Sequence, residues 1–591
     1  MTRPPPSLRL RPRPDGLLDA AQALVLPIMA PRLQGYATPD GRLELSLWGA
    51  GRLGVIRFTP LEGPFVYGPN RIQTKGGGIF AATSRPALLI RGAKLQRIHP
   101  ARSPAPWWMK IDPPKVTTEA SGLKAAVMPW GVVKICQSGD DLIITAGGHR
   151  AEARAAFELT PEQIIAEAEA HVRRCDGLPS ADPELRSMVM QGLHAALSSI
   201  RRHEDGSFAG LAAGLAYSAP ARTYFRDGYW TLQALLTLAP EVVAEEIELL
   251  SHGVHPDGEA PSAVIVADPV QAKAWREKVR AAPHMAKEHA KGREWWSDHF
   301  DSPFFFILMI GDYERATGDR GPADEHWGLI RAIFDRYRGF CAPGEALPLK
   351  PRHDRDWADN VFREGYVAYN LGLWVGALDV IARLGDAHDP LLAKEAAALA
   401  LLARIEIEAK LTVGDAYADY SAGDFVEDHL TLDSLTLLRN NAVPEDRALI
   451  ALEAVRMRLE SRSNRSQPWG DWGMICAYPP FKRRRDVRAK TAFAFRYHNG
   501  ADWPYLSGLY GWERLRRGLP GWRYPLTRWW KTSLANGWAG AVEYFSPPFG
   551  RGSLLQGWSA MPAAAVMAHT ATVLNGDPAE KEGAPFRAAG A

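Results

Sequence analysis

A long run of helical patterns without interspersed strands is the feature that most restricts the fold of this chain. From Asp182 to Leu574 apolar residues recur with the spacing of one helix face. A parallel-sheet fold needs strands that alternate with helices, so the pattern argues against a doubly wound sheet or a (β/α)8 barrel and favours stacked helical hairpins. Helix patterns cover 182–200, a segment starting at Pro240, 304–317, 361–383, 391–411, 444–460, 503–517 and 557–574.

The residues before this run have the two-residue period of β-strands. Arg42–Trp48 alternates polar with apolar side chains, and Val132–Cys136 and Leu142–Thr145 flank a turn-rich segment, which predicts a hairpin. Thr160-Pro-Glu-Gln163 then has the signature of a capped helix start. The predicted organisation is an N-terminal extension (1–33), a β-sandwich-like domain (34–158), a helical linker (159–181), a helical domain (182–576) and a flexible tail (577–591).

Composition restricts the partners and the location of the protein. Lys and Arg total 70 against 67 Asp and Glu, so a net charge of +3 provides no field that would attract nucleic acid or anionic lipid. No segment has the ~18 uninterrupted apolar residues of a membrane helix, and four scattered cysteines are too few for a disulfide framework. We therefore expect a cytoplasmic protein that binds neither nucleic acid nor membrane. The sequence leaves a homo-oligomer open.

Familiar cofactor and nucleophile motifs are missing from the sequence. There is no P-loop, no GxGxxG after a strand and no GxSxG elbow. No metal-ligand loop is evident either, although carboxylates are plentiful enough to leave a structural calcium ion undecided. We therefore expect no cofactor and assign no metal ligand.

Chemistry is expected in loops that combine charged with aromatic residues. In Arg222–Trp230, the pair Arg226 and Asp227 could bind sugar hydroxyls, while Trp230 could offer a flat face to the sugar ring. The alternative for this motif alone is a buried salt bridge beside a core tryptophan.

A second loop, His353–Asn360, holds three carboxylates beside Trp357 and leads into a predicted helix with Glu364 and Tyr369. Crowded, partly desolvated carboxyls have raised pKa values and suit a general acid, for which Asp356 and Asp359 are candidates. The alternative is an acidic helix N-terminus stabilised by the helix dipole, which we expect to hold for at least one of the three.

Two further loops follow near the C-terminus. One is Tyr497–Pro504; the other is Gly540–Gly550, continued by Gln556-Gly-Trp-Ser-Ala560. Glu543 lies among aromatic, proline and glycine residues, where a solvated surface carboxylate would have less reason to be found. Glu543 is therefore the stronger candidate for catalysis.

These four loops, in this order, resemble the six-hairpin glycoside hydrolases that include the glucosidase domain of glycogen-debranching enzymes (amylo-α-1,6-glucosidases), trehalases and processing α-glucosidases. The similarity spans 182–568 and rests on an ordered set of motifs that are individually weak. Those motifs are Arg226–Trp230, Asp301–Phe306 with Asp312-Tyr and Thr317–Asp319, Trp357–Asp359, Trp469–Gly473, Tyr497–Gly500 with Trp503-Pro, and Glu543 with Gln556–Ser559.

The resemblance implies an (α/α)6 barrel that hydrolyses a glycosidic bond with inversion at the anomeric carbon. It implies Asp359 as the general acid and Glu543 as the general base that activates water. The segment after Asp359 departs from the usual small residues, and Asp356 is a rival for the acid. The residues expected to hold the sugar are Arg226, Asp227, Trp230, Trp357, His498, Asn499, Trp503, Gln556 and Trp558.

Three functions remain open at this point. The first is an inverting, exo-acting hydrolase of an α-glucoside or related oligosaccharide. The second is a glycoside phosphorylase on the same fold, which would need a cationic phosphate cluster that the sequence does not reveal. The third is a non-catalytic sugar-binding protein, for which the aromatic loops would suffice without Glu543.

Overall fold

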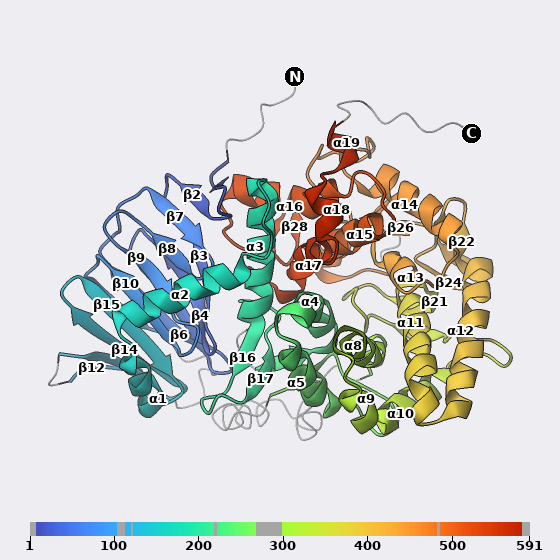
Figure 1. The fold of residues 1–591 in the computed structure, drawn as a ribbon, viewed down its shortest axis with the longest axis horizontal. Helices are drawn as coiled ribbons and strands as arrows, with labels where there is room; N and C mark the ends of the chain where they lie inside the picture. The colour runs from blue at the N-terminus through green and yellow to red at the C-terminus, as the bar shows by residue number, and fades with distance from the viewer. Residues whose placement is uncertain are drawn as a thin grey trace.

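The computed structural model describes residues 8–102, 113–119, 122–217, 221–266, 298–481 and 485–581. A β-rich part lies at one end of the molecule and helices form the rest, as the blue strands and the green-to-red helices of Figure 1 show. Residues 1–7 of the expected N-terminal extension and 582–591 of the expected tail lie outside the described residues.

Two antiparallel sheets form the β-rich part. They pack face to face, since a Cβ added to Gly131 of the larger sheet would lie 2.6 Å from Leu53 of the smaller one. The ten-stranded sheet has the order β1 (Arg11–Pro12), β2 (Leu18–Ala20), β7 (Phe65–Gly68), β8 (Arg71–Gln73), β9 (Gly78–Ala81), β10 (Ala87–Arg91), β15 (Asp141–Gly147), β14 (Gly131–Ser138), β13 (Lys124–Met128) and β12 (Lys115–Thr118). The five-stranded sheet has the order β11 (Leu95–Pro100), β6 (Gly51–Phe58), β5 (Arg42–Leu47), β4 (Leu33–Thr38) and β3 (Leu26–Met29).

The predicted hairpin is confirmed, because β14 and β15 pair with Cys136 opposite Ile143. The predicted boundary at residue 34 is wrong, because β1, β2 and β3 come from the expected N-terminal extension. These strands are short, and Pro12 and Pro27 interrupt their pattern. Proline lacks an N–H and is tolerated at a sheet edge. Both prolines are on edge strands, β1 of one sheet and β3 of the other.

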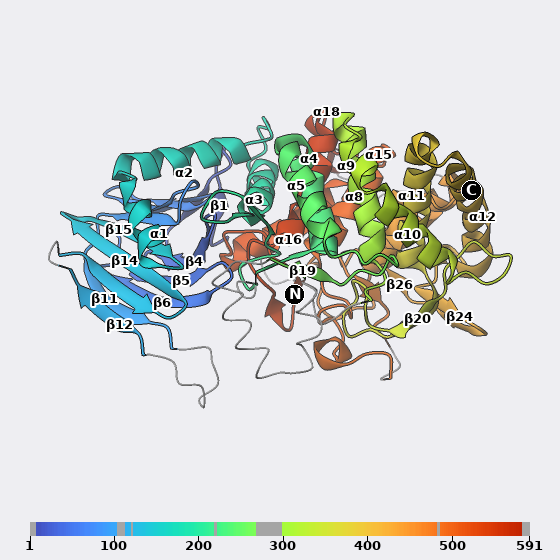
Figure 2. The ribbon, with the colours of Figure 1, turned by 90° about the horizontal axis from the view of Figure 1, so that it is seen from below.

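A helical connection covers the outer face of the larger sheet. After α1 (Arg150–Ala155), helix α2 (Pro161–Cys175) begins with the predicted capping box between Thr160 and Gln163. Ile164 and Ala168 of α2 pack against Phe80 and Leu89 in a small apolar cluster separate from the main core. Figure 2 shows α2 lying along the sheet and leading to the helical part.

Helices of the C-terminal part pack side by side in a closed cycle. Six of those described contact one another in chain order, and the last contacts the first. These inner helices are α4 (Phe225–Leu238), α8 (Ser302–Thr317), α11 (Ala368–Leu384), α13 (Thr436–Arg439), α15 (Pro504–Arg516) and α17 (Met561–Ala568). Helices α3 (Pro183–Ser199), α5 (Pro240–Ser251), α10 (Trp327–Arg338), α12 (Pro390–Leu411), α14 (Glu445–Leu459) and α16 (Arg523–Asn536) alternate with them along the chain.

The helix predicted over 557–574 is divided into a 3-10 turn (Gly557–Ala560), α17 and α18 (Thr570–Leu574). The other helix patterns of the sequence agree closely with these bounds, except at 361–383. There the helix begins only at Ala368, because Arg363–Val367 forms strand β21, which pairs with β24 (Tyr420–Ala422). Gly365 within it has a φ of +75°, which is incompatible with a continuous helix. Glu364 is therefore on a strand and not on the expected helix.

Glycines allow the inner helices to approach closely. A Cβ on Gly372 of α11 would lie 2.4 Å from the carbonyl carbon of Thr436 at the start of α13. Gly372→Ala is therefore expected to lower the free energy of unfolding by about 1–3 kcal/mol through overpacking. Gly328→Ala on α10 is the matched control, since its Cβ would meet nothing within 4 Å. Equal urea midpoints for the two variants would contradict this account.

The first residues of the expected flexible tail, 577–581, belong to the folded structure. Asp577 is only 3% exposed, and its carboxylate accepts hydrogen bonds from the backbone N–H groups of Gly521 (2.8 Å) and Arg523 (3.0 Å). Helix α19 (Pro578–Lys581) follows. Residue 577 is thus fixed to the turn before α16.

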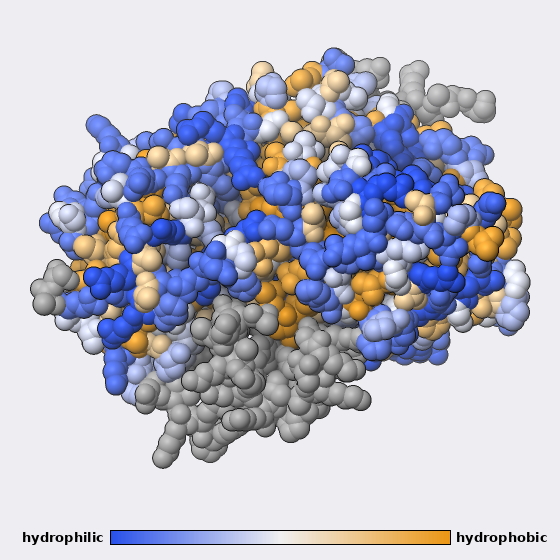
Figure 3. Space-filling view, turned by 60° about the horizontal axis from the view of Figure 1, so that its bottom comes forward, coloured by the Kyte–Doolittle hydropathy of each residue, from blue (hydrophilic) through white to orange (hydrophobic). Residues whose placement is uncertain are grey.

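The face drawn in Figure 3 is predominantly hydrophilic, with apolar residues in scattered patches. Such scattered exposure is ordinary for a globular surface. Among the helices that the structure describes, none combines the length and apolar character needed to span a bilayer.

Candidate active site

The N-terminal ends of several inner helices bring together residues from distant parts of the sequence. Arg226 and Asp227 are on the first turn of α4, and Asp301 immediately precedes α8. Tyr369 is on the first turn of α11, and Trp503 immediately precedes α15. Helix N-termini carry a partial positive charge, which favours carboxylates at this end of the helical part.

Asp359 projects from a tight turn into this region. Its side chain is 23% exposed, and one carboxylate oxygen lies 4.0 Å from the guanidinium of Arg226. The hydroxyl of Tyr497 donates to the other oxygen at 3.4 Å. Burial raises the pKa of Asp359 to about 6, although Arg226 opposes the shift. A carboxyl with this pKa can be protonated near neutral pH.

Asp356, the other candidate for the general acid, is hydrogen-bonded to the same turn. It is fully buried, and its carboxylate accepts hydrogen bonds from Arg363 (2.8 Å) and from the backbone N–H of Ala358 (3.0 Å), with Lys350 at 3.6 Å. Although burial alone would raise it, Arg363 and Lys350 hold the pKa of Asp356 far below its ordinary value. This carboxylate stays ionised and has no exposed surface.

Arg363 extends this buried ion-pair network. It also donates to Asp419 (2.8 Å) and Asp433 (2.6 Å), and Asp433 accepts a hydrogen bond from the indole N–H of Trp357 at 2.6 Å. The network therefore fixes the backbone of the segment that carries Asp359.

Asp356→Asn is expected to destabilise the fold, because it leaves Lys350 without its buried counter-charge and removes one of the three carboxylates that pair with Arg363. Breaking a buried pair by removing one partner costs about 3–5 kcal/mol. Thermal unfolding of this variant beside Asp354→Asn provides the measurement, since Asp354 pairs with the exposed Arg488. A melting temperature for Asp356→Asn equal to that of the control would contradict the network's role.

Glu543 lies in a narrow two-stranded loop. Its backbone N–H donates to the carbonyl of Ser553 at 2.8 Å, and the backbone N–H of Ser553 donates to its carboxylate at 2.9 Å. The hydroxyl of Tyr217 donates to the second carboxylate oxygen at 3.0 Å. A Cβ at Gly552 would lie 2.4 Å from this carboxylate, so a side chain there would displace it. Glu543 is 6% exposed, and these hydrogen bonds orient its carboxylate.

Asp227 is a third carboxylate of the same cluster. The side-chain amide of Gln556 donates to it at 3.1 Å, which joins two predicted site residues from opposite ends of the helical part. Burial raises the pKa of Asp227 to about 7; Arg226 opposes this shift, and the charges of Glu543 and Asp359 add to it. Because the charges of Glu543 and Asp359 both raise the pKa of Asp227, the three carboxyl groups interact electrostatically. The amide oxygen of Gln556 is buried and has no hydrogen-bond partner in the described part of the chain.

Arg226 combines both interpretations that the sequence allowed. It donates to the fully buried Asp301 at 2.9 Å, as a core salt bridge would, and Tyr369 donates to the same carboxylate at 3.0 Å. Its other terminal nitrogen faces Asp359. Arg226 is thus held on one side and presents a cation to Asp359 on the other.

Lys490 and Tyr217 were not predicted as site residues. The ammonium of Lys490 lies 3.2 Å from the ring centre of Tyr497 and 5.4 Å from that of Tyr544. Burial lowers the pKa of Lys490, while the charges of Glu543 and Asp359 partly restore it. No motif surrounds either residue, so only the fold reveals that Lys490 and Tyr217 accompany the carboxylates.

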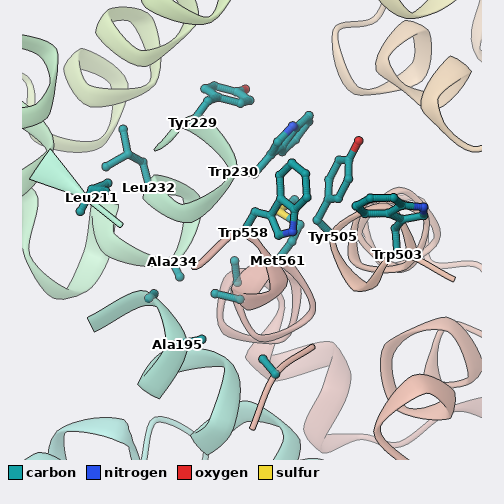
Figure 4. Close-up of a cluster of buried hydrophobic side chains, with 14 of the residues drawn as sticks. Ala195, Leu211, Tyr229, Trp230, Leu232, Ala234, Trp503, Tyr505, Trp558 and Met561 are labelled. Carbon is teal, nitrogen blue, oxygen red and sulfur yellow. The ribbon is translucent and has the colours of Figure 1, made fainter. Parts of the chain in front are cut away.

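Most of the predicted aromatic residues are packed rather than open. Trp230 and Trp503 are fully buried, and Trp357 and Trp558 are nearly so. Figure 4 shows Trp230, Tyr505, Trp558 and Trp503 in one layer of the core. Trp230 packs against Phe305 and Tyr505, as the core-tryptophan alternative supposed, so its expected stacking on a sugar ring is wrong for this structure. The same holds for Trp503.

His498 and Asn499 also differ from each other. His498 stacks on Trp503 at 4.7 Å, and both of its ring nitrogens are buried without a hydrogen-bond partner in the described residues. Their hydrogen-bonding capacity is unused among these residues. The amide of Asn499 is instead occupied by the backbones of Phe481 (2.8 Å) and Thr491 (3.0 Å), which makes it a loop-fixing residue and not the expected sugar ligand.

Sequence comparison identifies no relative, because no family model and no curated protein matches the chain. Its structure is similar to that of a bacterial glucoamylase solved in complex with acarbose, with a TM-score of 0.60 and 11% identity, covering 99% of this chain and 98% of that one. A rhamnosidase from Klebsiella oxytoca with rhamnose bound matches with a TM-score of 0.49 and 13% identity, covering 95% and 97%. The chain has the fold of the glucoamylase. The match includes both the β-rich and the helical part.

Proposed function

We propose that the chain is an inverting glycoside hydrolase of the six-hairpin, (α/α)6-barrel type, with Asp359 as the general acid and Glu543 as the general base. The observation that carries the proposal is the difference in surroundings between these two carboxyl groups of one cluster. One carboxyl has a pKa raised to about 6, and the other is a carboxylate held by two donors. Carboxyls in different environments divide acid from base roles.

The proposed reaction moves two protons. Asp359 donates its proton to the glycosidic oxygen as the bond from that oxygen to the anomeric carbon breaks. Glu543 takes a proton from the water that attacks the anomeric carbon from the opposite face, so the configuration inverts. This geometry calls for carboxyls about 6.5–9.5 Å apart, which leaves room for the water.

Unpartnered polar groups nearby suit hydroxyl recognition. The ring nitrogens of His498 and the amide oxygen of Gln556 have no hydrogen-bond partner in the described residues. Buried polar groups without partners are costly, and the hydroxyls of a bound sugar would satisfy them. The fold shared with a glucoamylase makes an α-linked glucoside our first choice of substrate, by analogy alone.

A phosphorylase fits the site less well. Phosphate would have to lie among Asp227, Asp359 and Glu543, and like charges at close range repel. Arg226 and Lys490 are the cations described in this cluster, and both already face carboxylates.

The proposal is tested by sugar release from a panel of α- and β-linked gluco- and manno-oligosaccharides, with and without phosphate. We expect phosphate-independent release from an α-glucoside, and proton NMR of the first product should show the β-anomer. Release of the α-anomer would contradict inversion. Release only with phosphate would replace the hydrolase by a phosphorylase, and binding without release would leave a sugar-binding protein.

A further inference from the structure

A cluster of nitrogen and sulfur ligands that shares no residue with the carboxylate site lies between the connecting helix α2 and the first helix of the helical part, α3. His171 and Cys175 are one turn apart on α2 and face His194 on α3. Their ligand atoms all lie within 4.8 Å of one another. His194 and Cys175 are almost fully buried, and His171 is 9% exposed.

The distances within this cluster match those around a tetrahedral zinc ion. Zn–N bonds of about 2.0–2.1 Å and a Zn–S bond of about 2.3 Å at tetrahedral angles put two nitrogens about 3.4 Å apart, and nitrogen and sulfur about 3.6 Å apart. Here Nε2 of His171 is 3.0 Å from Nδ1 of His194. The sulfur of Cys175 is 3.8 Å from the same His171 nitrogen. Only small side-chain shifts would complete the geometry.

Hydrogen bonding alone explains the cluster poorly. Nδ1 of His194 has two contacts, with His171 at 3.0 Å and with the hydroxyl of Ser198 at 2.8 Å. A ring nitrogen has either one lone pair or one hydrogen to offer, so it cannot serve both neighbours well. Nε2 of His194 is meanwhile buried without a hydrogen-bond partner among the described residues. A metal ion bound to Nδ1 would remove the conflict at that nitrogen.

A cavity of about 220 Å³ provides an entry path and room for a fourth ligand. His171 and Ser198 line it together with Met29, Asn70 and Thr83 of the β-rich part and Glu241 of α5. The cluster is thus at the junction of the two parts and is accessible from one side.

We propose that His171, Cys175 and His194 bind one Zn²⁺ ion, whose fourth position faces Ser198 and this cavity. Two histidines and one thiolate are ligands that Zn²⁺ prefers. On binding, the Cys175 thiol releases its proton to solvent and the sulfur forms the Zn–S bond. Because α2 lies on the larger sheet and α3 belongs to the helical part, the ion would cross-link the two parts of the molecule.

The test is metal binding by the full-length protein. After chelation with EDTA, the protein is dialysed against zinc chloride and then against metal-free buffer, and zinc is measured by mass spectrometry. We expect about one ion per chain in the wild type and background levels in Cys175→Ser and His194→Ala. Cys136→Ser is the matched control, since this half-buried cysteine on β14 is not in the cluster, and it should bind like the wild type.

Cobalt substitution identifies the sulfur ligand independently. Co²⁺ bound by the wild type should show a thiolate-to-metal charge-transfer band, and that band should be lost in Cys175→Ser. Far-ultraviolet circular dichroism checks that each variant is folded. Metal-free wild-type protein after dialysis against zinc would overturn the proposal, as would stoichiometric binding that Cys175→Ser and His194→Ala leave unchanged.

Discussion

Glu543→Gln is expected to lower kcat on an oligosaccharide by roughly 10²–10⁴-fold, the contribution typical of a positioned general base. Glutamine keeps the size of the side chain and can still interact with Tyr217 and the backbone N–H of Ser553. It cannot accept a proton from water. Steady-state kinetics should therefore show a fall in kcat with KM little changed, because the loss occurs in the transition state.

Azide rescue distinguishes the loss of a general base from a structural disturbance of the active site. In Glu543→Ala, azide can attack the anomeric carbon without losing a proton, so added azide should restore bond cleavage and produce a glycosyl azide of inverted configuration. Tyr217→Phe is the control, since it removes one hydrogen bond to Glu543 but keeps the carboxylate, and azide should not accelerate it. Glu543→Gln with activity within twofold of the wild type would exclude Glu543 from the mechanism.

The sequence predicted the regions of the site better than the individual roles. The loops of Asp227 and Gln556 lie far apart in the chain, yet their side chains are hydrogen-bonded. The sequence could not show which of Asp356 and Asp359 is the acid. In the structure, buried Arg363 and Lys350 pair with Asp356 and not with Asp359. Lys350 precedes the motif, and Arg363 reaches Asp356 only because β21 turns back beside β20 (Lys350–His353).

The fold was predicted where local patterns decide it. Long helices such as α12 and α14 follow the sequence pattern, because their buried residues recur with the spacing of one helix face. Strands of two to four residues, such as β1 and β3, are too short for a period to be recognised. The cluster of His171, Cys175 and His194 was missed for another reason. Its ligands belong to two helices, and only their packing brings them together.

Asp359→Asn is expected to lower kcat/KM on an oligosaccharide by roughly 10²–10⁴-fold, because the leaving oxygen then departs without a proton. A glycosyl fluoride needs little protonation at its leaving group, so its hydrolysis should fall much less. Asp354→Asn is the matched control, since Asp354 lies in the same loop but pairs with the exposed Arg488. An equal loss on both substrates would assign Asp359 a structural role.

The pH profile of the wild type provides the second measurement for Asp359. A general acid must be protonated to act, and the pKa of Asp359 is raised to about 6. The value of kcat/KM should therefore fall as the pH rises through this range, since the fraction of enzyme with a protonated acid decreases. With the glycosyl fluoride this basic limb should flatten, because protonation no longer limits the rate. A basic limb that is the same for both substrates would mean that a group other than the general acid titrates in this range. The general acid would then have to be another residue of the cluster. Asp227 would be the first candidate, because its pKa is raised to about 7.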